Sequence, residues 1–130
     1  MIVVDASVMV EILLATPAAG RIWTRLFADG ETLHAPHLID VEVAQALRSY
    51  SLAEKLNPAR GLAALEDFAA FRMMRYPHTP FLSRIWQLRL SVTAYDAVYL
   101  ALAERLEAPL LTRDAALARF SGHHAKIELI

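Results

Sequence analysis

The chain has 130 residues, no cysteine and a formal net charge of −1. The length is that of one domain, and we expect residues 1–130 to form a single one. The missing cysteines exclude disulfides, thiol nucleophiles and thiolate metal sites, and the charge excludes holding nucleic acid by phosphate neutralisation alone. No basic leader precedes Arg21 and no uncharged stretch is long enough to span a bilayer, so we expect a soluble, cytoplasmic protein with no membrane contact.

Short apolar runs alternate along the chain with segments of helical periodicity. The first run, Ile2–Val4, is continuous in apolar character, which is typical of a strand covered on both faces. The expected strands are 2–5, 33–35, 73–76, 109–112 and 127–130. The expected helices are 7–14, 21–28, 38–52, 59–71, 80–90, 97–106 and 115–120. This alternation predicts an α/β sandwich with a mainly parallel sheet.

Four acids fall where these elements begin or end. Asp5 closes the first strand, Glu42 lies early in a helix, Asp96 opens the most apolar helix, and Asp114 follows the strand 109–112. Such positions gather at one rim of a parallel sheet. Two carboxylates about 4 Å apart repel by about 4 kcal/mol at an effective dielectric of about 20. The pattern therefore predicts a hard divalent cation held by carboxylate oxygens.

Each acid also has a simpler explanation. Asp5 and Asp114 are good helix N-caps, because their side-chain oxygens accept an unpaired backbone N–H. Thr93 could take the capping role in place of Asp96, and Glu42 suits the macrodipole near a helix start. Taken singly, Asp5 is more often a cap and Glu42 a solvated acid. Only the convergence of all four favours a shared site.

The candidate substrate contacts are less well defined. Arg113 adjoins the proposed site and is the best candidate for a phosphate contact. Arg72, Arg75 and His78 surround Tyr76, which indicates either a basic and aromatic patch or, preferably, a solvated loop.

The segments that carry these acids resemble PIN domains, and among them toxins of the VapC type. The matching segments are VVDASV at 3–8, Glu42 in its helix, YDAVYLALA at 95–103 and LTRD at 111–114. The order and spacing match over nearly the whole chain. One position departs from the family pattern, since Gln45 stands where an Asn is common after the helix Glu.

The resemblance implies a three-layer α/β/α sandwich with a central parallel sheet. It implies a Mg²⁺- or Mn²⁺-dependent endoribonuclease whose catalytic and metal-binding residues correspond to Asp5, Glu42, Asp96 and Asp114. Ser7 and Thr112 are its polar companions. It also implies an RNA substrate, a homodimer, and inhibition by a cognate antitoxin as the toxin half of a type II toxin–antitoxin pair.

Three other classes of protein are alternatives, and one of them, a DNA nuclease of the flap-processing kind, needs extra clamp elements for which the chain is too short. A protein-interaction module with the same fold but no catalysis is the main alternative, and the complete set of acids argues against it. A phosphotransfer domain of the receiver type needs a lysine after a late strand, and neither Lys55 nor Lys126 follows a suitable one.

The apolar share of the chain is 56%, above the roughly 45–50% typical of soluble domains. A small domain has little interior in which to bury the excess, so we expect some apolar surface to meet a partner. Alanine-rich helices are the alternative explanation.

Overall fold

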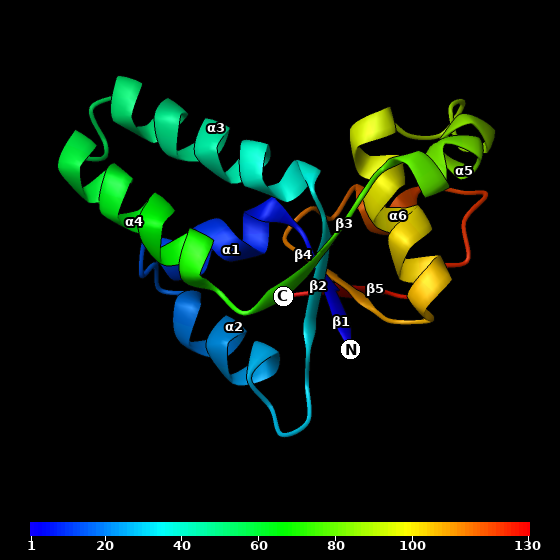
Figure 1. Ribbon diagram of the computed structural model, residues 1–130, viewed down its shortest axis with the longest axis horizontal. Coiled ribbons are helices and arrows are strands. Elements are labelled where there is room, and N and C mark those ends of the chain that lie inside the picture. The colour runs from blue at the N-terminus through cyan, green and yellow to red at the C-terminus, as the bar shows by residue number, and fades with distance from the viewer.

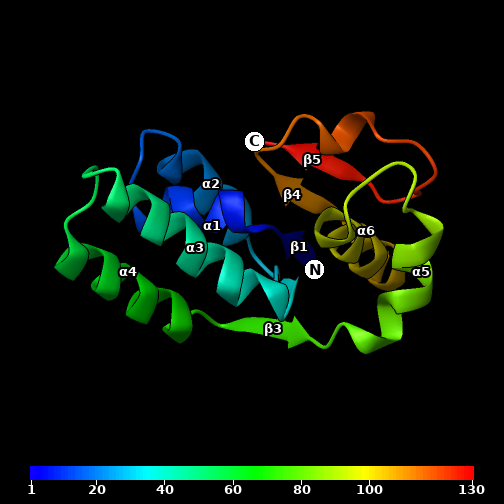
Figure 2. The same cartoon turned by 90° about the horizontal axis from the view of Figure 1, so that it is seen from above.

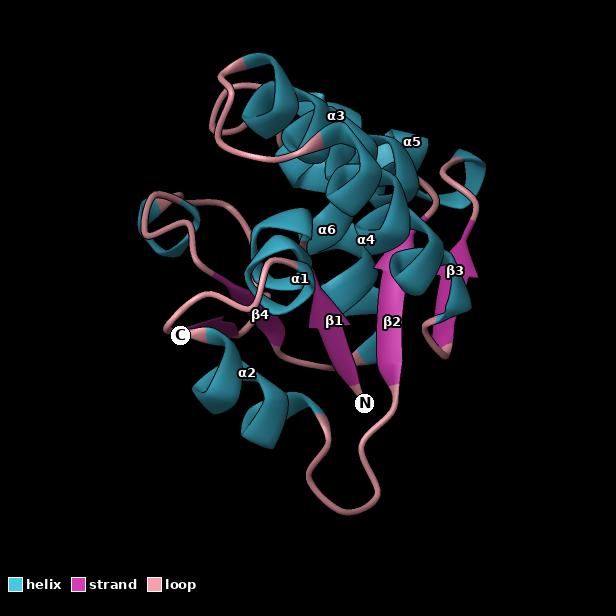
Figure 3. Ribbon diagram, turned by 90° about the vertical axis from the view of Figure 1, so that its left-hand side faces the viewer, coloured by secondary structure: helices cyan, strands magenta, loops and turns pink.

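A five-stranded parallel sheet forms the centre of the protein, in the order β3-β2-β1-β4-β5. The computed structural model describes all residues 1–130. The strands are β1 (Ile2–Val4), β2 (Leu33–Pro36), β3 (Met73–Tyr76), β4 (Leu110–Thr112) and β5 (Ile127–Leu129). All four strand pairings are parallel, so the sheet is wholly rather than mainly parallel, and the C-terminal ends of the strands meet at one rim (Figure 3).

Helices cover both faces of this sheet. They are α1 (Ala6–Leu13), α2 (Ala19–Leu26), α3 (Leu38–Leu52), α4 (Pro58–Ala70), α5 (Leu82–Gln87) and α6 (Ala94–Leu106). Figures 1 and 2 show α1 to α4 on one side of the sheet and α5 and α6 on the other. The three-layer α/β/α sandwich is thereby confirmed. None of the helices is long and apolar enough to cross a membrane.

The apolar strand β1 is the middle strand of the sheet, and both of its faces are covered. Ile2, Val3 and Val4 are fully buried. Val3 pairs with His34 of β2 on one side and with Leu110 of β4 on the other. A central strand has no solvent face, which explains the continuous apolar run. Asp5 follows directly and is therefore delivered to the rim.

Helix α6 packs between the sheet and α5, and this position accounts for its apolar side chains on all sides. Its residues from Ala97 to Ala103 are all buried. Its N-terminus is fixed by Thr93, whose hydroxyl accepts the N–H of Asp96 at 3.2 Å and donates to the Asp96 carboxylate at 3.0 Å. This reciprocal pair resembles a capping box and satisfies one otherwise unpaired donor. Thr93 is thus the cap, and Asp96 lies in the first turn.

Two expected helices are shorter in the structure. The segment 80–90 consists of a 3-10 turn at Thr79–Phe81 and the short helix α5. Helix α5 ends at Gln87 because the N–H groups of Arg89 and Ser91 donate to carbonyls three residues earlier and so close tight turns. The segment 115–120 contains only a 3-10 turn at Leu117–Arg119. These differences are local and leave the rim unchanged.

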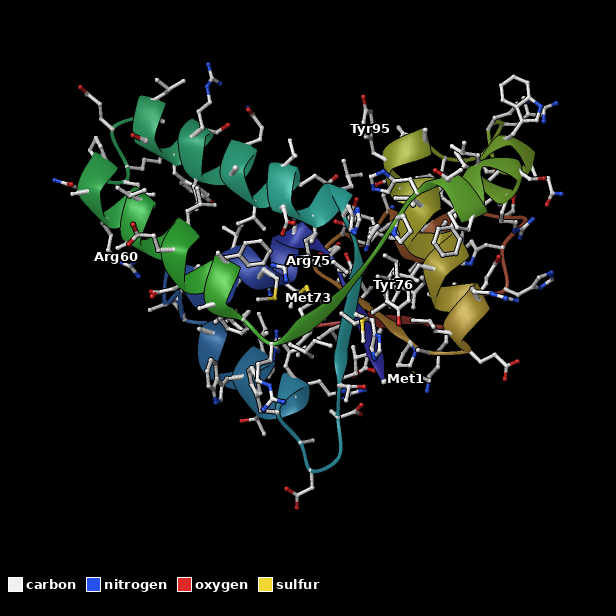
Figure 4. All side chains as sticks on the ribbon, in the orientation of Figure 1. Met1, Arg60, Met73, Arg75, Tyr76 and Tyr95 are labelled. Atoms are coloured by element: carbon white, nitrogen blue, oxygen red, sulfur yellow. The ribbon has the colours of Figure 1, made fainter.

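The basic and aromatic side chains around Tyr76 connect β3 to β2 and to the start of α3. The Tyr76 hydroxyl and His34 Nδ1 lie 2.8 Å apart, which joins β3 to β2. Arg75 donates to Asp40 at 2.7 Å, and His78 accepts the N–H of Leu38 at 2.9 Å, which fixes the start of α3. Figure 4 shows Arg75 and Tyr76 on β3. The expected strand at 73–76 is confirmed as the edge strand β3, whereas the interpretation of these basic residues as a solvated loop was wrong, because Arg75 and His78 make structural side-chain contacts.

Candidate active site

One pocket of about 480 Å³ at the rim contains all four predicted acids. Asp5 enters it from the end of β1, Glu42 from α3, Asp96 from the first turn of α6, and Asp114 from the turn after β4. Ser7 also lines the pocket. The chain therefore brings together side chains from four separated segments, as the parallel topology requires.

Asp5 is the most enclosed of these acids, with 8% of its surface exposed. Its Oδ1 accepts the Ser7 hydroxyl at 2.6 Å and the N–H of Val8 at 3.2 Å, so Asp5 is also the N-cap of α1. Its Oδ2 accepts the hydroxyl of Thr112. Burial raises the pKa of Asp5, and the bonds from Ser7, Thr112 and Val8 oppose that rise. The cap and site interpretations of Asp5 are compatible.

Ser7 and Thr112 each connect Asp5 to the turn after β4. The Ser7 hydroxyl accepts the N–H of Arg113 at 3.0 Å, and the Thr112 hydroxyl accepts the N–H of Asp114 at 2.9 Å. Each hydroxyl thus donates to the Asp5 carboxylate and accepts a backbone N–H from the turn that carries Asp114. The two bridges hold the end of β1 and the Asp114 turn in fixed relation.

Glu42 is held by a residue that the sequence interpretation did not single out. The hydroxyl of Tyr99, a buried residue of α6, donates to the Glu42 carboxylate. Burial raises the pKa of Glu42, the charges of Asp5 and Asp96 raise it further, and the Tyr99 hydrogen bond opposes them. Burial and the nearby acids also raise the pKa of Tyr99, so its hydroxyl stays protonated and remains a donor.

A sequence signal for Tyr99 does exist. It lies three residues after Asp96, and side chains three apart share a helix face. Its position inside a uniformly apolar helix hid that relation.

Asp96 and Asp114 each keep one carboxylate oxygen without a protein partner. Asp96 uses Oδ2 in its bond with Thr93, and Asp114 uses Oδ1 to accept the N–H of Ala116 at 2.8 Å. Their remaining oxygens make no protein hydrogen bond. Both acids are held by short-range hydrogen bonds and still have lone pairs for a ligand.

No protein cation neutralises the pocket. The structure has six ion pairs, and none includes Asp5, Glu42, Asp96 or Asp114. The charges of Asp5 and Asp96 add to the rise that burial causes in the pKa of Glu42, as expected for like charges without a counter-charge. Four carboxylates in this situation fit a hard divalent cation such as Mg²⁺ or Mn²⁺.

The acids do not form a ready-made coordination set. Nowhere in the structure do three acidic, histidine or cysteine side chains converge closely enough to hold one ion. The shared pocket is thus present, but ligation would require side-chain adjustment. The catalytic and metal-binding roles of the four acids stay predictions.

The side chain of Arg113 points to other partners than the pocket. Its Nε lies 3.4 Å from Glu11 and its Nη1 donates to the carbonyl of Ile130 at 2.9 Å. Arg113 is not among the residues that line the pocket, so only its backbone N–H serves the site. Gln45, which replaces the more common Asn, does line it.

Comparison with known proteins gives a consistent result. The model of the PIN domain family matches residues 2–122. Ribonuclease VapC12 of Mycobacterium tuberculosis is 44% identical over 130 residues, which cover 100% of this chain and 99% of the relative. Ribonuclease VapC1 of the same species is 40% identical over 129 residues, covering 98% and 96% of the two chains.

Solved structures share the fold at low sequence identity. The crystal structure of VapBC2 from Rickettsia felis, bound to a DNA fragment from their promoter, matches with a TM-score of 0.72 at 14% identity, covering 99% of this chain and 98% of that one. That of Mycobacterium tuberculosis VapC20, a sarcin-ricin loop cleaving toxin, matches with a TM-score of 0.69 at 12% identity, covering 92% and 94%. With the family match and these full-length relatives, the chain belongs to the PIN domain family, within its VapC group.

Proposed function

We propose that this protein is a divalent-metal-dependent endoribonuclease, the toxin of a type II toxin–antitoxin pair. The observation that carries the proposal is the pocket in which Asp5, Glu42, Asp96 and Asp114 meet without any protein cation. Full-length relatives named ribonucleases support RNA as the substrate. An RNA substrate also favours a cytoplasmic location.

The four acids would hold one or two Mg²⁺ or Mn²⁺ ions. When bound, such a cation lowers the pKa of water and stabilises charge on a phosphoryl oxygen. Asp96 and Asp114 each have an unpaired oxygen with which to orient an attacking water. Asp5 and Glu42 are fixed by hydroxyl donors and would offer their carboxylate oxygens to the cation. Water attack leaves a 5′-phosphate and a 3′-hydroxyl and needs no ribose 2′-OH.

Family membership and the exposed apolar side chains both support protein partners. Structures of VapBC2 from Rickettsia felis and of FitAB bound to a DNA fragment are among the fold relatives. This chain leaves large apolar side chains exposed, which suits a cognate antitoxin and a homodimer. They include Trp23, Leu52, Leu62, Trp86 and Leu90. An arginine of the antitoxin inserted among the acids would displace the metal, because guanidinium pairs well with carboxylates.

A catalytically inactive interaction module is the second candidate. The observation in its favour is that no three acids converge on one point in the structure. An inactive module should not bind divalent cations in this pocket, whereas a nuclease must.

Cleavage of RNA by the purified protein tests the proposal. We expect structured RNA to be cut in Mg²⁺ or Mn²⁺, to survive in EDTA, and to be cut again when the cation is restored. End analysis should find 5′-phosphates. Cleavage that continues unchanged in EDTA would contradict the metal-dependent mechanism, and absence of cleavage with either cation would favour the inactive module.

A further inference from the structure

The pocket that contains the acids also has an apolar wall that faces solvent. Tyr95 of α6 is 64% exposed and Val41 of α3 is 68% exposed, and both line the same pocket as the acids. Each is the immediate chain neighbour of a site acid, Tyr95 of Asp96 and Val41 of Glu42. Figure 4 shows Tyr95 projecting away from the body of the protein at the start of α6.

Folding does not account for the position of Tyr95. Its hydroxyl takes part in no hydrogen bond, and its ring is in none of the aromatic pairs of the structure. By contrast Tyr99, one turn along the same helix, is buried and bonded to Glu42. The exposed ring of Tyr95 is therefore free to contact a ligand of the pocket that it lines.

The charge of the pocket limits what Tyr95 can bind. No arginine or lysine lines the pocket, and its charged side chains are all carboxylates. A nucleic-acid backbone would therefore be repelled here except where a cation bridges it to the acids. Any further affinity at this position must come from the uncharged part of the nucleotide. Aromatic side chains provide that affinity by stacking on bases, with little sequence preference.

We propose that Tyr95, backed by Val41, is the stacking platform for the nucleobase next to the scissile phosphate. The proposal rests on the ribonuclease function above. Phosphate and base belong to the same nucleotide, so a phosphate held at the acids carries its base to the adjoining wall. Tyr95 is in this view a substrate-positioning residue, which acts on binding of RNA and not on the cleavage step.

The test compares kcat and KM for a short RNA that the wild-type protein cuts. Tyr95→Ala should raise KM about tenfold, the loss expected for one stacked base, with kcat within about twofold of wild type. Tyr95→Phe keeps the ring and should behave as wild type. Tyr50→Ala is the matched control, because Tyr50 is an exposed tyrosine of α3 that does not line the pocket.

A substrate that lacks the base separates stacking from other effects. With an abasic nucleotide beside the cleaved phosphate, wild type and Tyr95→Ala should have the same KM. The proposal is overturned if Tyr95→Ala cleaves intact RNA like wild type, or if its defect is equal on abasic RNA. It is also overturned if the variant loses only antitoxin binding. Failure of the wild-type protein to cut any RNA would instead overturn the ribonuclease function, and the platform with it.

Discussion

Asp5→Asn is expected to lower RNA cleavage by about 1,000-fold or more while leaving the protein folded. Lewis-acid stabilisation by a bound cation is worth several kcal/mol, and each 1.36 kcal/mol is a factor of ten in rate. Asparagine keeps an oxygen to cap α1 and has nearly the same shape. The amide nitrogen cannot accept the Thr112 hydroxyl, but the substitution also removes a buried charge, which offsets part of that loss in the metal-free protein.

Asp67→Asn is the matched control for this variant. Asp67 is an exposed acid of α4 that makes no ion pair and lies outside the pocket. It loses the same charge, so an effect of net charge on RNA binding would appear in both variants. Initial cleavage rates at saturating Mg²⁺ and circular dichroism spectra provide the comparison. A folded Asp5→Asn protein with wild-type activity would remove Asp5 from the site.

Thr112→Val should lower both stability and activity. Thr112 is fully buried, donates to the Asp5 carboxylate and accepts the N–H of Asp114. Valine fills the same space but leaves a carboxylate oxygen and an N–H unpaired. Each unsatisfied group costs about 1–3 kcal/mol, so the free energy of unfolding should fall by about 2–6 kcal/mol. Loss of a residue that orients a metal-binding group should cost about 10–100-fold in activity.

Thr112→Ser separates the hydroxyl from the volume of the side chain. Serine keeps both hydrogen bonds and loses one methyl group, so it should cost about 1 kcal/mol and retain most of the activity. Urea denaturation and cleavage rates measured on both variants provide the test. If Thr112→Val were as active as Thr112→Ser at a temperature where both are folded, the hydroxyl bridge would have no part in positioning Asp5.

The sheet was predictable because the chain repeats one simple rule. A strand buried on both faces is mostly apolar, and β1, β2 and β4 are buried at every position, with only His34 and Thr112 polar among them. The order of the strands is not a local property and did not follow from the residues themselves. The errors fall where the local signal is weak, as in the short α5, whose end depends on tight turns after Gln87.

The rim position of the acids was predictable for a related reason. Residues that directly follow parallel strands must share an edge, which brings Asp5 and Asp114 to one place. The direction of a long side chain was not predictable, because it depends on contacts far away in the chain. The Arg113 side chain contacts Glu11 and Ile130, and the Tyr99 hydroxyl of α6 donates to Glu42 of α3. The Arg113–Glu11 ion pair and the hydrogen bonds of Arg113 to Ile130 and of Tyr99 to Glu42 are tertiary contacts, and the local sequence does not specify these partners.

Calorimetric titration of Mn²⁺ into the metal-free protein tests directly whether the acidic pocket is a metal site. Ligating carboxylates must be ionised, and the pKa values of Asp5 and Glu42 are raised, mainly by burial. Protons therefore compete with the metal as the pH falls. Binding should be saturable, tighter at about pH 7.5 than at about pH 5.5, accompanied by proton release, and lost in Asp5→Asn. No saturable binding to the wild-type protein, or the same affinity in Asp5→Asn at both pH values, would contradict a metal site in this pocket.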